Sequence, residues 1–290
     1  MTTLAGWIGA DSRGPASLYL VSDSRITWLR SADARKVVEA NWDNGRKTFA
    51  SHTSAEIFGY SGDVLLPTQT IGQITELIDS GAVSLVDASP QGRLEWIVNS
   101  LEASCRAYPK SASRDFSLLY GGRQGEGMNC SFYAFALEFK NGAIVTQTTI
   151  AIPTSSGPLT YFDDQERFAF GSGRDGFKAC WNRWRQSEIG GTSRSIFSAF
   201  TDHIKSEVDP CTGGPPQLVG IYRVGPAKAF GIIWDQCRFL GGMEAVDVSD
   251  EQRLNWHNDL FELCDASSMR RGKTAQPQPR PSRPWRKPFY

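Results

Sequence analysis

The order of strand-like and helix-like segments limits this chain to few folds. Short runs rich in aliphatic and aromatic residues, bounded by Gly, Pro, Asn and Ser, predict strands, and apolar residues three and four apart predict amphipathic helices. These signals follow one another as strands, two helices, strands, two helices and strands. The predicted strands are 4–10, 17–23, 47–51, 56–60, 116–120, 131–139, 143–150, 167–170, 217–224 and 227–234, and the predicted helices are 68–80, 93–108, 175–186 and 193–208.

Two stacked sheets satisfy this order with the fewest exposed apolar faces. Half-buried sheets and amphipathic helices each need a packing partner. We therefore predict an α+β fold, a four-layer αββα sandwich in which each of two antiparallel sheets is covered on its outside by a helix pair. Asn141-Gly142 predicts a hairpin turn between two of the strands. An alternating β-α-β-α arrangement does not fit the order.

The predicted domain occupies residues 1–240, and the remainder differs in composition. Residues 241–268 form an extension in which apolar positions between 249 and 264 predict one more helix. Residues 269–290 are rich in Pro and carry seven basic and no acidic side chains, a composition that predicts a disordered tail. Such a tail could attract phosphates, but we favour a solvated segment or a docking peptide over nucleic-acid binding.

Composition also excludes several classes. A membrane-spanning helix needs about 20 apolar residues in succession, and the apolar runs here are shorter than half of that. The first residues lack the charged and apolar regions of a secretory signal, which predicts the cytoplasm. The six cysteines are dispersed without a C-x-x-C pair, so we expect reduced thiols, no disulfide framework and no zinc site.

The second residue is the first candidate for chemistry. Met1 precedes the small residue Thr2, a context in which the initiator methionine is expected to be removed. Thr2 would then carry a free α-amine, with a pKa of about 8, beside its own hydroxyl, so that one residue supplies both a base and a nucleophile. The same start without any catalytic role is common in cytosolic proteins.

Further matches follow in order along the chain. The segments Thr-Thr-Leu-Ala-Gly at 2–6, Ser-Asp-Ser-Arg at 22–25, Arg-Lys at 46–47, Gly-Tyr-Ser-Gly-Asp at 59–63, Gly-Ser-Gly at 171–173 and Asp-Pro-Cys-Thr-Gly-Gly at 209–214 together resemble the proteasome β-subunit and HslV family of N-terminal-nucleophile (Ntn) hydrolases. The resemblance covers most of residues 2–234. It implies the Ntn-hydrolase form of the αββα fold.

The resemblance implies a role for each matched residue. Thr2 is the nucleophile, Lys47 is the cation that lowers the pKa of its hydroxyl, and Asp23 pairs with Lys47. The backbone N–H of Gly59 is the expected oxyanion donor. The remaining matches are Ser172 and Asp209, expected to hydrogen-bond around the Thr2 amine, with Arg25, Thr212 and Gly173 in support.

The implied activity is that of a threonine peptidase, a reaction that requires no metal and no organic cofactor. Peptide bonds would be hydrolysed through an acyl ester on Thr2, within a self-compartmentalised homo-oligomeric ring that takes peptides or unfolded protein, in some relatives from an ATPase. Two alternatives stay open, namely an Ntn amidase acting on one small amide and a non-catalytic structural or binding subunit that keeps Met1.

The intervals between the matched residues depart from the family. The chain from Thr2 to Asp23 and the chain from Asp23 to Lys47 are both longer than in compact bacterial relatives. Lys36 is therefore a rival for the buried cation, although Lys47 lies at the start of a strand and twelve residues before Gly59. Of the three histidines, none lies in a recognisable nucleophile elbow.

Overall fold

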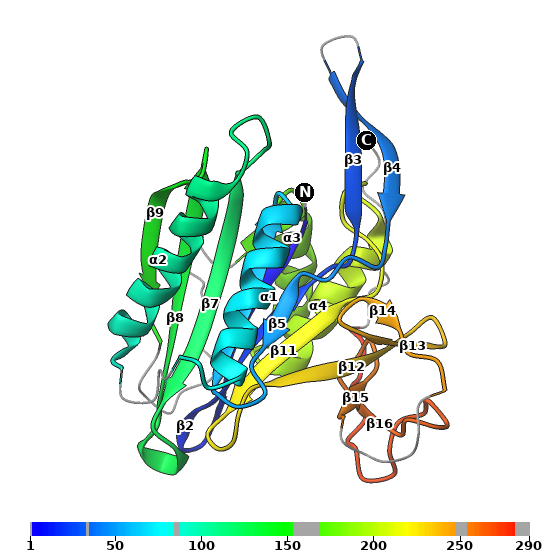
Figure 1. Ribbon diagram of the computed structural model, residues 1–290. Coiled ribbons are helices and arrows are strands. Elements are labelled where there is room, and N and C mark those ends of the chain that lie inside the picture. The colour runs from blue at the N-terminus through cyan, green and yellow to red at the C-terminus, as the bar shows by residue number, and fades with distance from the viewer. Residues whose placement is uncertain (1, 33–34, 84–87, 153–168, 248–253, 282–290) are drawn as a thin grey trace.

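The computed structural model describes residues 2–32, 35–83, 88–152, 169–247 and 254–281, and Figure 1 shows their arrangement. Over these residues the chain combines four α-helices with three β-sheets. The α+β class predicted from the sequence is confirmed. No helix within these ranges is both long enough and apolar enough to cross a membrane.

The larger sheet contains the first two strands of the chain and several of the last. Its central order is β10-β1-β2-β11-β12-β13-β14, with β15 added in parallel to β12 and β16 paired to β15. Because β1 and β2 pair antiparallel, with Leu4 opposite Ser22, the start of β1 lies beside the end of β2. The strands are β1 Leu4–Asp11, β2 Gly14–Ser22, β10 Ala169–Phe170, β11 Gln217–Tyr222, β12 Lys228–Trp234, β13 Cys237–Leu240, β14 Met243–Glu244, β15 Trp256–His257 and β16 Leu263–Cys264.

The second sheet is an antiparallel meander in the order β5-β6-β7-β8-β9. Asn141 and Gly142 connect β8 to β9 with φ values of 52° and 78°, the two positive values that a type I′ hairpin turn requires. The hairpin predicted there is confirmed. The strands are β5 Thr48–Ala50, β6 Glu56–Gly62, β7 Phe116–Gln124, β8 Ser131–Lys140 and β9 Ala143–Ile150.

Four helices follow the predicted pattern of two pairs. They are α1 Leu65–Asp79, α2 Pro90–Ala107, α3 Arg174–Arg185 and α4 Ser193–Ser206. Local chemistry fixes two of the starts. The Ser89 hydroxyl accepts from the Gly92 amide ahead of Pro90 in α2, and Thr192 and Ser195 form a reciprocal capping box at α4.

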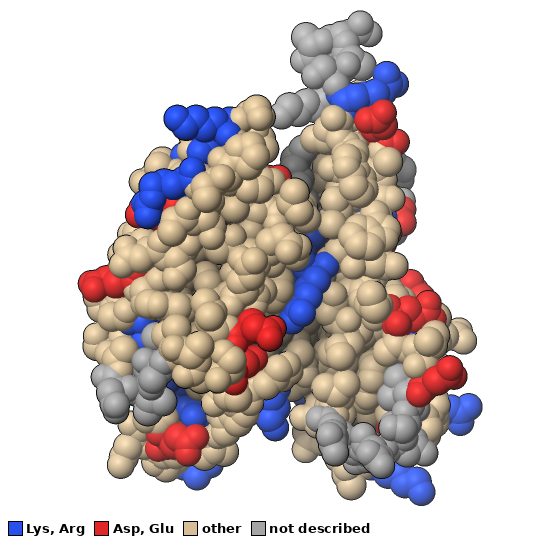
Figure 2. All heavy atoms as spheres, viewed as in Figure 1, with Lys and Arg blue, Asp and Glu red and all other residues tan. Residues whose placement is uncertain are grey.

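A long hairpin, β3 Ile26–Ala32 paired with β4 Arg35–Trp42, projects away from both sheets (Figure 1). Sequence patterning did not predict these strands because their apolar residues do not face a core. Trp28 and Trp42 are each 50% exposed, and register places them on one face of the hairpin, opposite Ala40 and Ile26 respectively. Figure 2 shows that much of the surface on this side of the molecule is uncharged.

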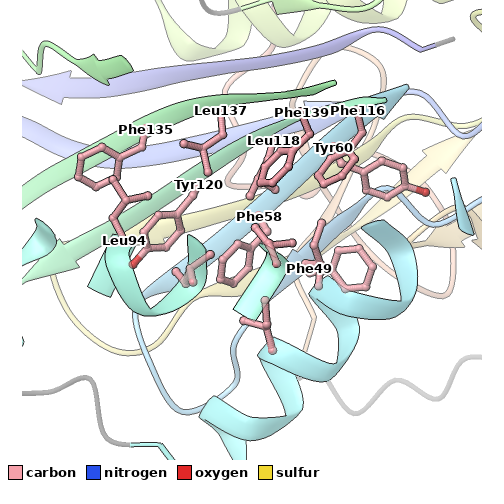
Figure 3. Packing of buried hydrophobic residues seen from close by; sticks show 14 of the residues in the cluster. Phe49, Phe58, Tyr60, Leu94, Phe116, Leu118, Tyr120, Phe135, Leu137 and Phe139 are labelled. Atoms are coloured by element: carbon pink, nitrogen blue, oxygen red, sulfur yellow. The ribbon is translucent and has the colours of Figure 1, made fainter. Parts of the chain in front are cut away.

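Three groups of buried side chains fill the molecule. One lies between the β5–β9 sheet and helices α1 and α2, and Figure 3 shows its aromatic side chains, Phe58 and Tyr120 among them, pointing toward these helices. A second lies between the larger sheet and helices α3 and α4 and contains Trp7 and Trp184. The third joins residues of β1, β2 and β11 to residues of β6, β7 and β8. Each sheet therefore buries residues of both its faces.

The C-terminal region differs from the prediction. Where the sequence predicts a helix over 249–264, the described residues 254–264 contain the short strands β15 and β16. The side chain of Asn258 accepts from the amides of Leu260 and Glu262, and Phe261 has a φ of 59°. This turn competes with the helix, as asparagine side chains commonly do.

The tail also differs from the disordered segment predicted over 269–290. Its described part, 269–281, lies against the domain, where Arg280 forms ion pairs with Asp202 at 2.9 Å and with Asp259 at 2.6 Å. The Gln278 amide donates to Glu262 at 2.7 Å. Composition alone favoured disorder because it does not show that acidic side chains on α4 and shortly before β16 bind the tail. Residues 282–290 lie outside the described ranges.

Candidate functional site

The beginning of β1 is buried and is held by its neighbouring strand. Thr2 is 2% exposed and Thr3 is fully buried. The Thr3 amide donates to Asp23 Oδ1 at 3.0 Å, and the Asp23 amide donates to the Thr3 carbonyl at 3.2 Å. Since Asp23 directly follows β2, the antiparallel pairing of β1 with β2 is what brings the predicted residue 23 next to the predicted residue 2.

Lys47 and Asp23 form an ion pair without solvent exposure. Lys47 Nζ lies 3.0 Å from Asp23 Oδ1 and donates to the Arg25 carbonyl at 2.5 Å. Asp23 Oδ2 accepts from the amides of Arg25 and Gly213, each at 3.1 Å. A buried charge is tolerated when its partners satisfy it, and here Asp23 accepts four hydrogen bonds. Burial lowers the pKa of Lys47, and the Asp23 carboxylate opposes that shift.

The rival cation, Lys36, lies elsewhere in the fold. It belongs to β4, opposite Ser31 in the projecting hairpin, whereas Lys47 follows that hairpin and immediately precedes β5. The Lys47 amide donates to the side-chain oxygen of Gln217 at 2.9 Å, and the Gln217 amide group donates to the Gly45 carbonyl at 2.6 Å. Gln217, which sequence reasoning missed, thus fixes the segment that carries the cation; its only signal was a polar residue opening an apolar strand.

A second set of polar side chains approaches Thr3 from the other side. Asp209 Oδ2 accepts from the hydroxyls of Ser172, at 2.6 Å, and Thr212, at 2.8 Å. The Thr212 hydroxyl in turn lies 2.8 Å from that of Thr3. Three predicted residues therefore meet, contributed by the start of α3 and by the loop between α4 and β11. They reach the residue that follows Thr2.

Glycines allow this close approach. Gly171 has a φ of 92°, and a Cβ there would lie 1.6 Å from the Thr2 carbonyl oxygen. A Cβ on Gly173 would lie 1.9 Å from the Thr3 hydroxyl and 2.5 Å from that of Thr212. Any side chain at either position would push the α3 start away from β1. The Gly-Ser-Gly sequence at 171–173 is thus explained by packing against residues 2 and 3.

The backbone amide of Gly59 does not point in the direction that its predicted role requires. Its side-chain position faces Leu4, and the amide of the next residue, Tyr60, donates to the Lys47 carbonyl at 3.1 Å. Successive amides of a strand point to opposite edges, so the Gly59 amide points to β7, where it is opposite Leu119. This geometry argues against the Gly59 amide as an oxyanion donor to Thr2.

Arg25 supports the site from the surface side. Its guanidinium binds both carboxylate oxygens of Asp43, at 2.7 and 2.9 Å, a bidentate arrangement that holds its plane fixed. The side chain lies over Gly213, where a Cβ would come 2.3 Å from its central carbon. Arg25 therefore fixes the loop whose amide binds Asp23. Asp43 is a second residue that sequence reasoning missed.

His203 of α4 is the third residue of the site that sequence reasoning missed. Its Nε2 lies 3.2 Å from the Thr3 hydroxyl, and the residue is 1% exposed. Burial lowers the pKa of His203, while Asp209 and Asp23 oppose that shift. Sequence reasoning considered histidines only as partners of a serine or cysteine, and no local motif marks this one.

Two cavities adjoin Ser172. One of about 160 Å³ extends toward Ser61, Gly62 and Lys140, and the other, of about 400 Å³, extends toward Asp175, Val208 and Pro210. Within the described residues, no three His, Cys, Asp or Glu side chains gather as metal ligands.

Comparison with known proteins finds similar chains among solved structures alone. No family model matches the chain, and no curated protein matches it. Among solved structures it is similar to Anbu (ancestral beta-subunit) from Yersinia bercovieri, with 15% identity and a TM-score of 0.47 over 76% of this chain and 81% of the other. It is also similar to a Gly-1 mutant of Anbu from Hyphomicrobium sp. strain MC1, with 13% identity and a TM-score of 0.47 over 79% and 87%.

These matches correct the family assignment made from the sequence. Anbu proteins are proteasome-like but form a family distinct from HslV-like Ntn hydrolases, so the assignment to the proteasome β-subunit and HslV family is wrong.

Proposed function

We propose that this protein is an amide hydrolase whose nucleophile is the hydroxyl of Thr2, exposed as the N-terminal residue after removal of Met1. One observation carries the proposal. The buried Lys47 ammonium and the Thr3 amide bind the same oxygen of Asp23, both at 3.0 Å, so a desolvated cation is held beside the residue next to Thr2.

The chemistry follows from groups that one threonine supplies. The Thr2 oxygen attacks the substrate carbonyl carbon while its proton passes to the Thr2 amine, directly or through water. The C–N bond breaks, the leaving nitrogen takes that proton, and the acyl group stays on Thr2 as an ester. Water then hydrolyses the ester, again with the amine as base, and restores the hydroxyl.

Lys47 assists by electrostatics. An ammonium has three donors, of which two go to Asp23 and the Arg25 carbonyl, and we assign the third to the Thr2 hydroxyl. A nearby cation lowers the pKa of a hydroxyl. Asp209, Ser172 and Thr212 are assigned to the surroundings of the amine. Gly59 has no part in this mechanism because its amide faces β7.

The fold in which the site is placed is proposed to be the four-layer αββα sandwich. The three core groups support it, since one lies under α1 and α2, one joins the two sheets and one lies under α3 and α4. We further propose a threonine peptidase acting on peptides or unfolded protein in the cytoplasm, as a homo-oligomer. An ATPase that supplies substrate remains part of the same proposal.

The nucleophile is tested by mass and by covalent labelling. Intact-mass measurement should show the loss of Met1, and an electrophile that reacts with an N-terminal threonine should add once, on the peptide that begins at Thr2. Thr2→Ala should reduce turnover of fluorogenic peptides by about 10⁴-fold or more and abolish the label. The exposed Thr146→Ala is the matched control and should keep both.

Three outcomes would overturn the assignment or redirect it. Met1 retained on every molecule excludes the mechanism and favours a non-catalytic subunit. A label that persists in Thr2→Ala, with an unchanged thermal unfolding midpoint, places the nucleophile elsewhere. Turnover of a small amide with no turnover of peptides supports the amidase instead of the peptidase.

The oligomer is tested at the projecting hairpin. Trp28 and Trp42, each 50% exposed on one face, are the contacts we assign to a second copy of the chain. Interface hot spots are enriched in tryptophan, and truncating one costs about 2 kcal/mol or more. Trp28→Ser with Trp42→Ser should therefore shift sedimentation toward the monomer, while Val145→Ser, at a 55% exposed residue of β9, should not. A wild-type monomer at all concentrations would contradict the assembly.

A further inference from the structure

His203 of α4 packs against the start of α3 and lies beside Thr3 at the start of β1. It lies on the inner side of α4 with 1% of its surface exposed. A Cβ on Gly173 would lie 2.6 Å from its Nε2, and one on Gly176 would lie 2.5 Å from its Cε1. The first turn of α3 therefore packs directly on the imidazole. A side chain at either glycine would displace the ring from Thr3.

Counting protons fixes the direction of the hydrogen bonds around it. The Asp209 carboxylate only accepts, so the Thr212 hydroxyl donates its proton to Asp209 Oδ2 at 2.8 Å. The Thr3 and Thr212 hydroxyls lie 2.8 Å apart, and with the Thr212 proton already used, the proton between them must come from Thr3. Nothing is then left on Thr3 to donate to His203.

Nε2 of His203 must therefore carry the proton and donate it to the Thr3 oxygen at 3.2 Å. The neutral ring then has a bare Nδ1, and this atom has no hydrogen-bond partner among the described residues. Adding a proton to Nδ1 would bury an unsatisfied donor, which agrees with burial lowering the pKa of His203. The directed chain runs from His203 through Thr3 and Thr212 to Asp209.

Thr3 is consequently the link between the two charged networks of the site. Its amide binds Asp23 and its carbonyl accepts from the Asp23 amide. On the opposite side, its hydroxyl accepts from His203 and donates to Thr212. Each polar atom of Thr3 is thereby fixed, and the covalent neighbour Thr2 is fixed with it.

We propose that His203 is a positioning residue, which in its neutral Nε2–H form holds Thr3, and through Thr3 the nucleophile Thr2, in register between Lys47 and Asp209. This inference rests on the proposed function for its catalytic consequence. The hydrogen-bond chain itself does not depend on it.

The catalytic consequence is tested with two substitutions of different chemistry. His203→Leu fills the space without a donor and should lower kcat and the labelling rate about 10- to 100-fold, the scale of a misplaced reacting group, with little change in KM. The side-chain amide of His203→Gln places an N–H near the position of Nε2 and should restore kcat to within about threefold of wild type. Equal losses in the two variants, or no loss in either, would overturn the proposal.

Thr3→Val supplies an independent check on the route. It removes the hydroxyl through which His203 is proposed to act, so Thr3→Val should lower kcat as His203→Leu does, and the double variant should lose no more than either single one. Additive losses would show that His203 acts by another path. Thermal unfolding midpoints measured on every variant separate loss of folding from loss of positioning.

Nitrogen-15 NMR of the imidazole separates this inference from the proposed function, since it needs no activity. At neutral pH the wild-type ring should show a protonated Nε2 and a bare Nδ1, and Thr3→Val should shift the Nε2–H resonance. An Nδ1–H or a charged ring would overturn the chain even in an active enzyme. If wild type shows no turnover and no label while the ring has the expected form, only the proposed function fails.

Discussion

Lys47→Met is expected to lower the free energy of unfolding by about 3–5 kcal/mol, because it leaves the Asp23 carboxylate buried without its counter-ion. Both side chains are fully buried in the ion pair. The remaining donors to Asp23 are the amides of Thr3, Arg25 and Gly213, which satisfy its oxygens but do not neutralise its charge. Chemical denaturation of the variant, compared with wild type, measures the loss.

The same variant should also lose labelling and turnover, since the proposed mechanism takes the effect of a cation from Lys47. Lys110→Met is the matched control, because Lys110 is exposed and surface substitutions usually change stability by less than about 0.5 kcal/mol. A Lys47→Met protein that keeps both its stability and its labelling rate would contradict the assigned role. Loss of labelling with wild-type stability would confine Lys47 to chemistry.

Arg93→Met should have a destabilising effect of similar size, about 3–5 kcal/mol, at a site remote from the proposed chemistry. Arg93 of α2 forms an ion pair at 2.5 Å with Glu56, which is fully buried in β6. The hydroxyls of Tyr120 and Tyr133 also donate to Glu56. Without Arg93 the carboxylate would remain in the core with hydroxyl donors alone.

The loss of stability caused by Arg93→Met should become smaller as the pH falls. Burial already raises the pKa of Glu56, while Tyr120 and Arg93 oppose that shift, so removing Arg93 raises it further. A carboxyl whose pKa is raised by folding contributes stability that is fully present below its unfolded value, near 4.5, and lost as the pH rises through the folded value. The difference between Arg93→Met and wild type should therefore be smaller at about pH 5 than at about pH 8.

Two controls sharpen this prediction. Arg106→Met removes an exposed arginine of the same helix, whose pair with Glu102 spans 3.7 Å, and should cost about 0.5 kcal/mol or less. Adding Glu56→Gln to Arg93→Met removes the unpaired charge and should recover at least about half of the loss, because tyrosine hydroxyls can accept from the new amide as well as donate to it. A double variant less stable than Arg93→Met would contradict the ion-pair explanation.

Hydrophobic periodicity predicted most of the helices and strands because buried residues recur at a spacing that differs between helices and strands. All four helices were found within a few residues of their ends, and the predicted strands correspond to β1, β2 and β5 to β12. The hairpin 26–42 was missed because Trp28 and Trp42 are exposed, so no apolar face marked it. The predicted C-terminal helix was wrong because Asn258 forms a turn there. The described part of the tail, predicted to be disordered, instead packs on acidic residues that are distant in sequence.

The sequence by itself determined the α+β class, the pairing of helices in the chain and the residue types available at the start of β1, since each of these depends on local spacing and composition. The resemblance implied that Lys47 pairs with Asp23, and the tertiary structure decided between this lysine and its rival and which other residues meet there. It paired Lys47, not Lys36, with Asp23, turned the Gly59 amide toward β7, and brought His203 to Thr3. The physical reason is that strand register and helix packing set these contacts between residues up to 200 positions apart, and register is a property of the assembled sheets.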